Sequence, residues 1–228
     1  MILIYQDLID NPPALLAFLA AFMVAFITGI AFHEFSHAWA ANELGDATAA
    51  RQGRLSLNPI RHLDPYGTLL LLIIGIGWGK PTPVNPMNLR VGVRRGSAIV
   101  AFAGPLSNFV FATIAALPIK LGWVDSIASF SNIDDASGSE IFGLFLIFII
   151  YYNVLLGLFN LIPIHPLDGF KVVWGLLPRN LAREFGTLEQ YGPVCLMILF
   201  VVGFVAPQYS PLRWLLDEVG SRIFAFLV

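Results

Sequence analysis

Two histidines and a glutamate lie within one short stretch of the sequence, in the pattern His33-Glu34-x-x-His37. Because residues four apart project from the same face of a helix, both imidazoles can reach a single metal ion. A carboxylate beside the first histidine can take a proton from a water bound to that ion. The residue types and their spacing therefore predict a hydrolytic zinc site, with His33 and His37 as metal ligands and Glu34 as the general base.

A catalytic zinc ion usually has three protein ligands and one open position, so a third ligand must come from elsewhere in the chain. Cys195 is the only cysteine, which leaves histidine or a carboxylate. His62 lies in a basic loop, where a solvated or interfacial histidine is more common than a ligand. Asp168 follows an apolar run that Pro163 and Pro166 interrupt, so its carboxylate can turn back toward the two histidines. An Asp-Gly pair is otherwise a turn signal, but here we predict Asp168 as the third ligand.

The segments that carry these residues are apolar enough to need lipid. The 228 residues are 57% hydrophobic and 12% charged, with a mean hydropathy of +0.75. Soluble proteins have about 25% charged residues. Two histidines and a glutamate inside such a helix are costly, which favours a functional site over simple hydrogen bonding between helices. The net charge of −2, without any aromatic-basic stripe, argues against nucleic acid as a partner.

The pattern of apolar runs predicts an all-α polytopic membrane protein with about four to six transmembrane helices. The predicted crossings cover residues 13–41, 96–120, 141–162 and 191–206. Residues 66–78 are too short to cross and lead into a proline-rich stretch, which predicts a short re-entrant or β-like element before the Gly104-Pro-Leu-Ser-Asn108 helix. We expect one membrane domain over residues 1–228, with a core at about 14–170 and an amphipathic, membrane-associated tail at 207–228.

The basic residues indicate how the chain is oriented in the membrane. They cluster after the first crossing, before the second and before the last: Arg51, Arg54, Arg61, Arg90, Arg94, Arg95, Lys171, Arg179 and Arg183. The loop at 125–140 and residues 1–11 contain acidic but no basic residues, so we expect both outside, and the first residues are not a cleaved signal. The sequence thus predicts a multi-pass protein of a prokaryotic plasma membrane, with the site nearer the cytoplasm.

Two motifs together resemble the site-2 protease family of intramembrane zinc metalloproteases: H-E-x-x-H in one helix, and N-x-x-P-x-x-P-L-D-G after a later one. The resemblance runs from His33 through Gly79-Lys-Pro-Thr-Pro-Val-Asn-Pro86 and the Gly-Pro-Leu-Ser-Asn stretch to Gly169. It implies one zinc ion per chain, held by His33, His37 and Asp168, with Glu34 as the base and Asn160 beside the reacting carbonyl. The sequence resembles a compact form without PDZ or CBS domains.

A helical substrate has all its backbone groups bonded internally, so it must unwind before a peptide bond can be cut. An exposed edge of the enzyme can then supply replacement hydrogen bonds. The resemblance supports Thr82, Pro83, Val84 and Asn85 as such a substrate-binding edge, although from composition alone an ordinary loop is nearly as good an interpretation.

Two further polar residues have open interpretations. His165 is a departure from the family pattern; in a polyproline II segment it would lie on the same side as Asp168, where it could orient that carboxylate or face the substrate. An interfacial histidine is the equal alternative. We interpret Asn108 as a structural residue that lets neighbouring helices pack closely.

The sequence as a whole predicts an intramembrane zinc metalloprotease that hydrolyses peptide bonds within or near transmembrane segments of membrane-protein substrates, in regulated intramembrane proteolysis. Two rival classes use the same ligands: a membrane zinc transporter or sensor, and a catalytically inactive binder of membrane helices. Neither rival needs Glu34 as a base. The sequence leaves homo-oligomerisation open.

Overall fold

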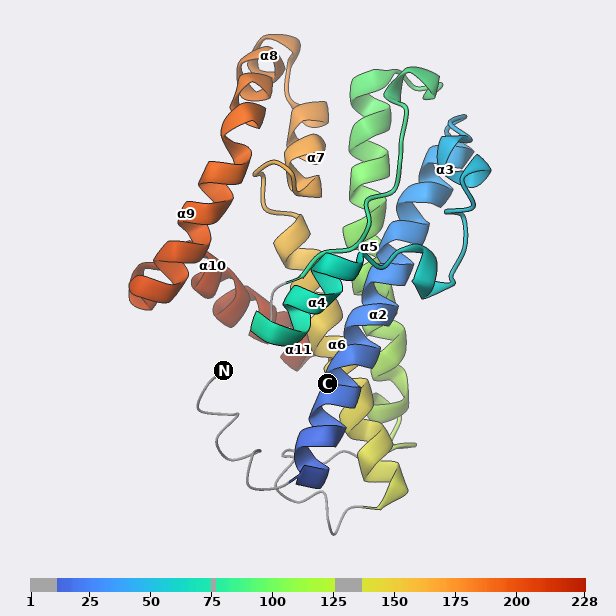
Figure 1. Cartoon of the computed structure of the whole chain (residues 1–228), viewed down its shortest axis with the longest axis vertical. Coiled ribbons are helices and arrows are strands. Elements are labelled where there is room, and N and C mark those ends of the chain that lie inside the picture. The colour runs from blue at the N-terminus through green and yellow to red at the C-terminus, as the bar shows by residue number, and fades with distance from the viewer. Residues whose placement is uncertain (1–11, 75–76, 126–136) are drawn as a thin grey trace.

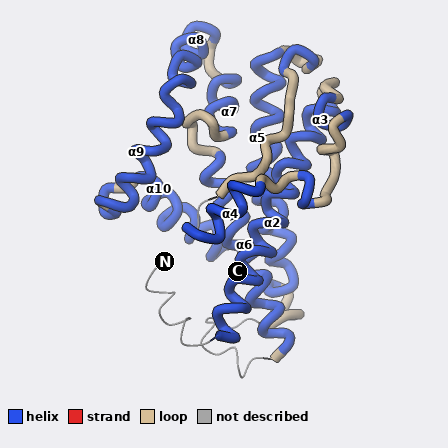
Figure 2. The backbone as a smooth tube through the Cα atoms, in the orientation of Figure 1, coloured by secondary structure: helices blue, strands red, loops and turns tan. Residues whose placement is uncertain are grey.

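The computed structural model describes residues 12–74, 77–125 and 137–228, and its regular elements are helical (Figures 1 and 2). The expectations for residues 1–11 and for most of the loop at 125–140 lie outside the described residues. The α-helices are α2 (Pro12–Glu43), α3 (Thr48–Arg51), α4 (Pro65–Ile74), α5 (Val93–Lys120), α6 (Gly138–Asn160), α7 (Asp168–Leu176), α8 (Arg179–Thr187), α9 (Gly192–Val205), α10 (Pro211–Trp214) and α11 (Ser221–Leu227). Short 3₁₀ turns occur at Pro59–Arg61, Pro86–Asn88, Leu188–Tyr191 and Pro207–Tyr209, and a π turn at Leu215–Gly220.

Four helical segments among the described residues are long and apolar enough to cross a membrane. They are α2, α5, α6 and the segment Arg179–Val205, which joins α8 to α9. This confirms the predicted all-α polytopic fold, because each predicted crossing overlaps one of these segments.

Helices α2, α5 and α6 pack together as a bundle that carries the site (Figure 1). On one side, Phe22 and Phe26 of α2 pack against Tyr152 of α6. On the other, small α5 residues such as Ala112 pack against Ile150 of α6. Apolar and small side chains let the helix backbones approach closely, as expected for helices that associate in lipid.

The residues that precede α4 and those that follow it lie next to each other. Leu63 and Gly79 form an isolated antiparallel bridge, and the Lys80 N–H donates to the carbonyl of His62 at 2.7 Å. The first turn of α4 touches the returning chain so closely that a Cβ added at Gly67 would lie 2.2 Å from the Trp78 carbonyl oxygen. A ten-residue helix whose flanking residues pair in this way enters and leaves on one side, which is the predicted re-entrant geometry.

Helix α6, the third helix of the bundle, ends shortly before Asp168. Helix α6 ends at Asn160, and α7 begins at Asp168 after a segment that contains Pro163 and Pro166. Neither proline has an N–H to continue a helix. Helix α7 then runs antiparallel to the first turns of α5, where Arg94 donates to the Trp174 carbonyl at 3.1 Å (Figure 1).

The tail predicted as amphipathic is helical and packs on the bundle. Leu216, Ile223 and Leu227 contact the apolar cluster formed by α5 and α6. The tail also carries exposed ion pairs, such as Arg213 with Asp217 at 3.0 Å. Part of the apolar surface of the tail therefore covers protein, while Trp214 and Phe226 stay exposed.

Candidate metal centre

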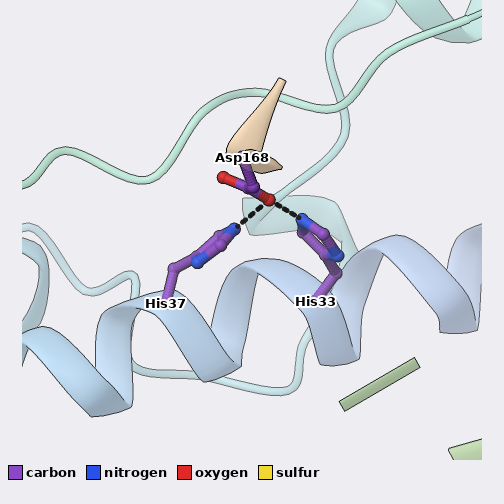
Figure 3. A group of neighbouring side chains, drawn as sticks. All are labelled: His33, His37 and Asp168. Carbon is purple, nitrogen blue, oxygen red and sulfur yellow. Dashed lines mark hydrogen bonds and ion pairs between the residues drawn. The ribbon is translucent and has the colours of Figure 1, made fainter. Parts of the chain in front are cut away.

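Two turns of α2 and the first residue of α7 bring three side chains to one point (Figure 3). The Nε2 atom of His33 lies 3.0 Å from Asp168 Oδ2, and the Nε2 atom of His37 lies 3.1 Å from the same oxygen. The potential ligand atoms of the three residues all lie within 4.8 Å of one another. The structure thus brings together the three residues that the sequence predicts as metal ligands.

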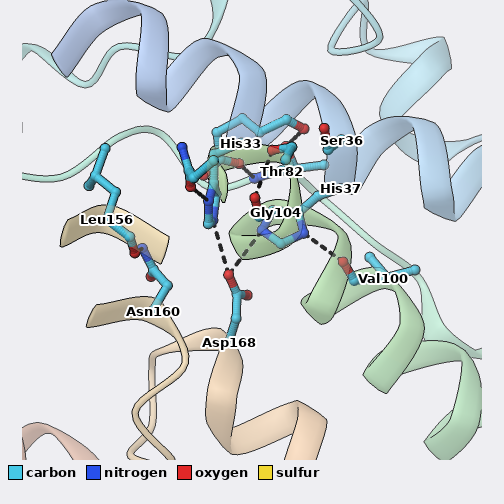
Figure 4. Close-up of polar contacts among 12 residues, drawn as sticks. His33, Ser36, His37, Thr82, Val100, Gly104, Leu156, Asn160 and Asp168 are labelled. Atoms are coloured by element: carbon cyan, nitrogen blue, oxygen red, sulfur yellow. Dashed lines mark hydrogen bonds and ion pairs between the residues drawn. The ribbon is translucent and has the colours of Figure 1, made fainter. Parts of the chain in front are cut away.

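The other nitrogen of each imidazole, Nδ1, is held by a hydrogen bond that it donates to α5. His37 Nδ1 lies 2.7 Å from the carbonyl oxygen of Val100, which can only accept, so this nitrogen carries the proton (Figure 4). His33 Nδ1 lies 2.7 Å from Asn108 Oδ1. The Asn108 amide nitrogen in turn donates to Asn153 Oδ1 at 2.8 Å, which leaves Asn108 Oδ1 to accept from His33.

These hydrogen bonds determine what the centre can bind. With both Nδ1 atoms protonated, the two Nε2 atoms direct lone pairs at the carboxylate of Asp168. Three acceptors that converge in a buried place need either a proton on one imidazole or a cation between them to offset their repulsion. Two neutral imidazoles and a carboxylate, each imidazole fixed by a hydrogen bond on its far nitrogen, are the donor set of a catalytic zinc site.

Gly104 of α5 packs directly against the two imidazoles (Figure 4). A Cβ added at this position would lie 2.5 Å from His37 Nε2 and 2.7 Å from His33 Cε1. A side chain here would occupy the space at the metal centre, so only glycine fits. The motif Gly104-Pro-Leu-Ser-Asn108 thus contributes both the space for the imidazoles and the Asn108 side chain.

Glu34 points toward the proline-rich segment that follows the re-entrant element. Its Oε2 atom accepts a hydrogen bond from the Thr82 N–H at 2.8 Å, and its backbone carbonyl accepts from Thr82 Oγ1 at 3.0 Å. This places the predicted base and the predicted substrate-binding edge in direct contact, with one carboxylate oxygen of Glu34 outside this bond.

A cavity of about 340 Å³ joins these features. Polar groups line it at the metal centre: His33, Glu34, His37, Asn160 and Asp168. Apolar groups line it as well: Phe26, Ile30, Trp78, Val84, Leu156 and Phe159. The Asn160 side chain donates to the Leu156 carbonyl at 3.0 Å, which uses one of its two amide hydrogens (Figure 4). Of the predicted edge, Thr82 and Val84 line the cavity.

The structure places two other histidines away from the metal centre. His62 is not part of the metal group, as the sequence predicted, but it is not the solvated or interfacial residue expected there: it is 0% exposed, and its Nε2 atom lies 2.6 Å from the Ser56 carbonyl. His165 Nδ1 lies 3.5 Å from Glu189, and its ring packs edge-on against Phe170. Among the described residues His165 makes no hydrogen bond to Asp168, which was one of the roles that the sequence left open for it.

Comparisons with known proteins identify the family. A family profile described as Peptidase family M50 matches residues 118–201. The "Putative zinc metalloprotease YwhC" of Bacillus subtilis (strain 168) is 37% identical over 201 residues, which cover 87% of this chain and 86% of that protein. The chain belongs to peptidase family M50, the site-2 protease family. The "Putative zinc metalloprotease Rip2" of Mycolicibacterium smegmatis is 28% identical over 200 residues, covering 86% of this chain and 70% of that protein. No solved structure matches.

Membership of M50 agrees with the donor set of the centre. The chain is a zinc metalloprotease and an integral membrane protein, with His33, His37 and Asp168 as the group that fits zinc. The sequence alone does not reveal the role of Asn108, which it indicates only as a residue that links helices. Asn108 does bond to α2 and α6, through the Gly29 carbonyl and Asn153, but it also accepts from a metal ligand of this M50 protein.

Replacing Asn108 by leucine is expected to weaken zinc binding by about 10- to 100-fold, because His33 loses the hydrogen bond that fixes its ring and its tautomer. The measurement is zinc affinity in competition with a chelator. Asn153→Leu is the matched control, since it removes a helix-to-helix bond of Asn108 but leaves the bond to His33. Equal losses in both variants would show that Asn108 acts only through helix packing.

Proposed function

We propose that this M50 protein is an intramembrane endopeptidase that cuts membrane proteins within or near their transmembrane segments, as a step in regulated intramembrane proteolysis. One observation carries the proposal: two metal ligands and the candidate base lie on a membrane-spanning helix, in a cavity whose other walls come from the spanning helices α5 and α6, the start of α7 and an extended segment. A spanning protein can approach such a cavity from within the bilayer.

Each residue of the site has a distinct role in the proposed hydrolysis of a peptide bond. Zinc bound by His33, His37 and Asp168 would polarise the scissile carbonyl and lower the pKa of water toward 7. Glu34 takes a proton from the attacking water and later delivers it to the departing amine. The Thr82 N–H holds one oxygen of this carboxylate, so the other is free for proton transfer. The second amide hydrogen of Asn160 can donate to the carbonyl oxygen as it gains negative charge.

The extended segment beside the base would hold the unwound substrate. A transmembrane helix that unwinds loses its internal backbone hydrogen bonds and needs replacements in a dry site. Thr82, Pro83, Val84 and Asn85 precede a 3₁₀ turn and run in an extended course beside α5 (Figure 2). Pairing along this edge would present a substrate carbonyl near Glu34.

The test is cleavage of a single-span membrane protein reconstituted with this peptidase in lipid vesicles, with the fragments identified by mass spectrometry. A cut within or beside the span supports the proposal. Cuts confined to water-exposed loops far from the span would contradict it, and zinc flux without any cleavage would favour a transporter.

We also propose that the site lies nearer the cytoplasm. Gln52, in the basic loop after α2, and Gly138, at the start of α6, are exposed and lie at opposite ends of the bundle (Figure 1). Single cysteines at these positions, in a Cys195→Ser background, are expected to react with a membrane-impermeant maleimide from opposite sides, with Gly138→Cys labelled in intact cells. Labelling of both from the same side would refute the topology.

A further inference from the structure

Two buried charged side chains near the extended segment have no part in the mechanism above. Asp46 follows α2 and is 0% exposed, and Arg54 follows α3 and is 6% exposed. Neither forms an ion pair among the described residues. Burying a charge is costly unless hydrogen bonds satisfy it, so the partners of these two residues indicate what they are for.

Asp46 holds the far end of the extended segment. Its Oδ2 atom accepts from the Asn85 N–H at 2.6 Å, and its Oδ1 atom accepts from the Asn88 side chain at 2.9 Å. Thr48 donates both its N–H and its hydroxyl to the same carboxylate. Burial alone would raise the pKa of Asp46, but these four hydrogen bonds outweigh it and hold the pKa below its ordinary value. The carboxylate is therefore ionised at neutral pH and makes strong, charge-assisted bonds.

Arg54 holds the near end of the segment. Its guanidinium donates to the carbonyls of Pro81 at 3.2 Å and Lys80 at 3.4 Å, and its other terminal nitrogen donates to the carbonyl of Arg61. A planar guanidinium with several donors can bind two successive carbonyls at once. Residues before and after Thr82 are thus fixed by different charged groups.

Between these anchors, the backbone of Val84 is left open. The Thr82 N–H is taken by Glu34, and Pro83 has no N–H. Among the described residues, no hydrogen bond uses the N–H or the carbonyl of Val84. The Val84 side chain packs against the cluster of Ala40, Ala41, Leu89 and Val100, and Val84 also lines the cavity. Val84 thus has a side chain fixed by packing and a backbone N–H and carbonyl available for hydrogen bonds, which is what an edge that binds an extended peptide requires.

We propose that Asp46 and Arg54 are positioning residues for proteolysis: they clamp both ends of the Lys80–Asn85 segment so that the backbone of Val84 stays open to pair with an unwound substrate beside Glu34. The proposal rests on the proposed function. The clamp keeps the edge in its bound conformation before substrate arrives, so less free energy is spent on ordering it. It also fixes the segment whose Thr82 N–H holds the base.

The first test asks whether Asp46 and Arg54, the two clamp residues, hold the Lys80–Asn85 segment in place. It measures hydrogen–deuterium exchange of the full chain in detergent micelles. Asp46→Asn and Arg54→Gln are expected to speed exchange of the Thr82 and Asn85 amides by about tenfold, because charge-assisted hydrogen bonds that hold the segment are lost. The matched controls are Glu43→Gln and Arg51→Gln, at the exposed ends of the helices that precede Asp46 and Arg54, and both should leave exchange unchanged. Unchanged exchange in the two clamp variants would overturn the proposal.

The second test separates positioning of the substrate from general stability. Fluorescein-labelled β-casein, an unfolded protein, serves as the extended probe, and its binding is measured in a Glu34→Gln background where nothing is cut. Asp46→Asn is expected to weaken this binding by about tenfold, with zinc content unchanged and, in the active enzyme, a rise in KM larger than the fall in kcat. Equal binding with and without the clamp would overturn the docking role. An enzyme that binds casein through the clamp but never cuts a membrane protein would instead overturn only the proposed function.

Discussion

Replacing Glu34 by glutamine is expected to leave zinc bound while the rate of peptide hydrolysis falls by about 10²- to 10⁴-fold. Glu34 is not one of the three converging ligands, so the metal centre is untouched. Glutamine can still accept the hydrogen bond from the Thr82 N–H, so the extended segment stays in place. What is lost is the group that takes and returns a proton. The measurements are zinc content of the purified protein and cleavage of a reconstituted single-span substrate.

Glu43→Gln is the matched control for this variant. Glu43 lies on the same helix but is exposed at its end, so its replacement removes the same charge without touching the cavity. It should keep both zinc and activity. A Glu34→Gln enzyme that cuts at nearly the wild-type rate would mean that another group is the base.

The metal centre could be predicted because two of its three ligands are recognised by their spacing within one short stretch of sequence. His33 and His37 share a face of α2 through spacing alone, and no tertiary contact is needed to bring them together. Asp168 required one more step, the inference that prolines end the preceding helix, and α6 and α7 are indeed separate helices. The crossings were predictable for a similar reason, since length and hydropathy are properties of single segments.

The remaining parts of the site depend on contacts between distant residues, which no local pattern encodes. The bond from His33 to Asn108 joins α2 to α5, and an asparagine in a spanning helix has the same appearance whether it binds another helix or a metal ligand. The need for glycine at position 104 likewise becomes visible only when the structure shows two imidazoles packed against it. The burial of His62 also follows from the packing of the loop around it, and composition alone suggested a solvated residue.

His165 shows the limit of reasoning from backbone periodicity. A three-residue turn would place it on the side of Asp168, but the segment is too short and too strongly bent by its prolines for a regular period to apply. Its ring instead packs against Phe170 of α7, and its Nδ1 atom lies 3.5 Å from Glu189 in the 3₁₀ turn after α8. Whether His165 affects the substrate stays a prediction.

Replacing Asp168 by alanine is expected to abolish both zinc binding and proteolysis. Asp168 Oδ2 is the atom on which the two imidazoles converge, and it supplies the only negative charge among the three ligands. Two neutral imidazoles alone hold zinc poorly. Glu189→Ala is the control: it removes a carboxylate beside the segment that joins α6 to α7, yet it contacts His165 and no ligand. Stoichiometric zinc retained in Asp168→Ala would point to a different third ligand.

Thermal unfolding distinguishes loss of the metal from loss of the fold in this variant. A ligand that binds only the native state stabilises it by mass action, by about 2.7 kcal/mol when its free concentration is a hundred times the dissociation constant. Wild type, Glu34→Gln and Glu189→Ala should therefore melt at a higher temperature with zinc than with a chelator, because their three ligands are intact. Asp168→Ala should melt cooperatively at one temperature under both conditions. A zinc-dependent rise in that variant equal to the rise in wild type would exclude Asp168 from the metal site, whatever its effect on catalysis.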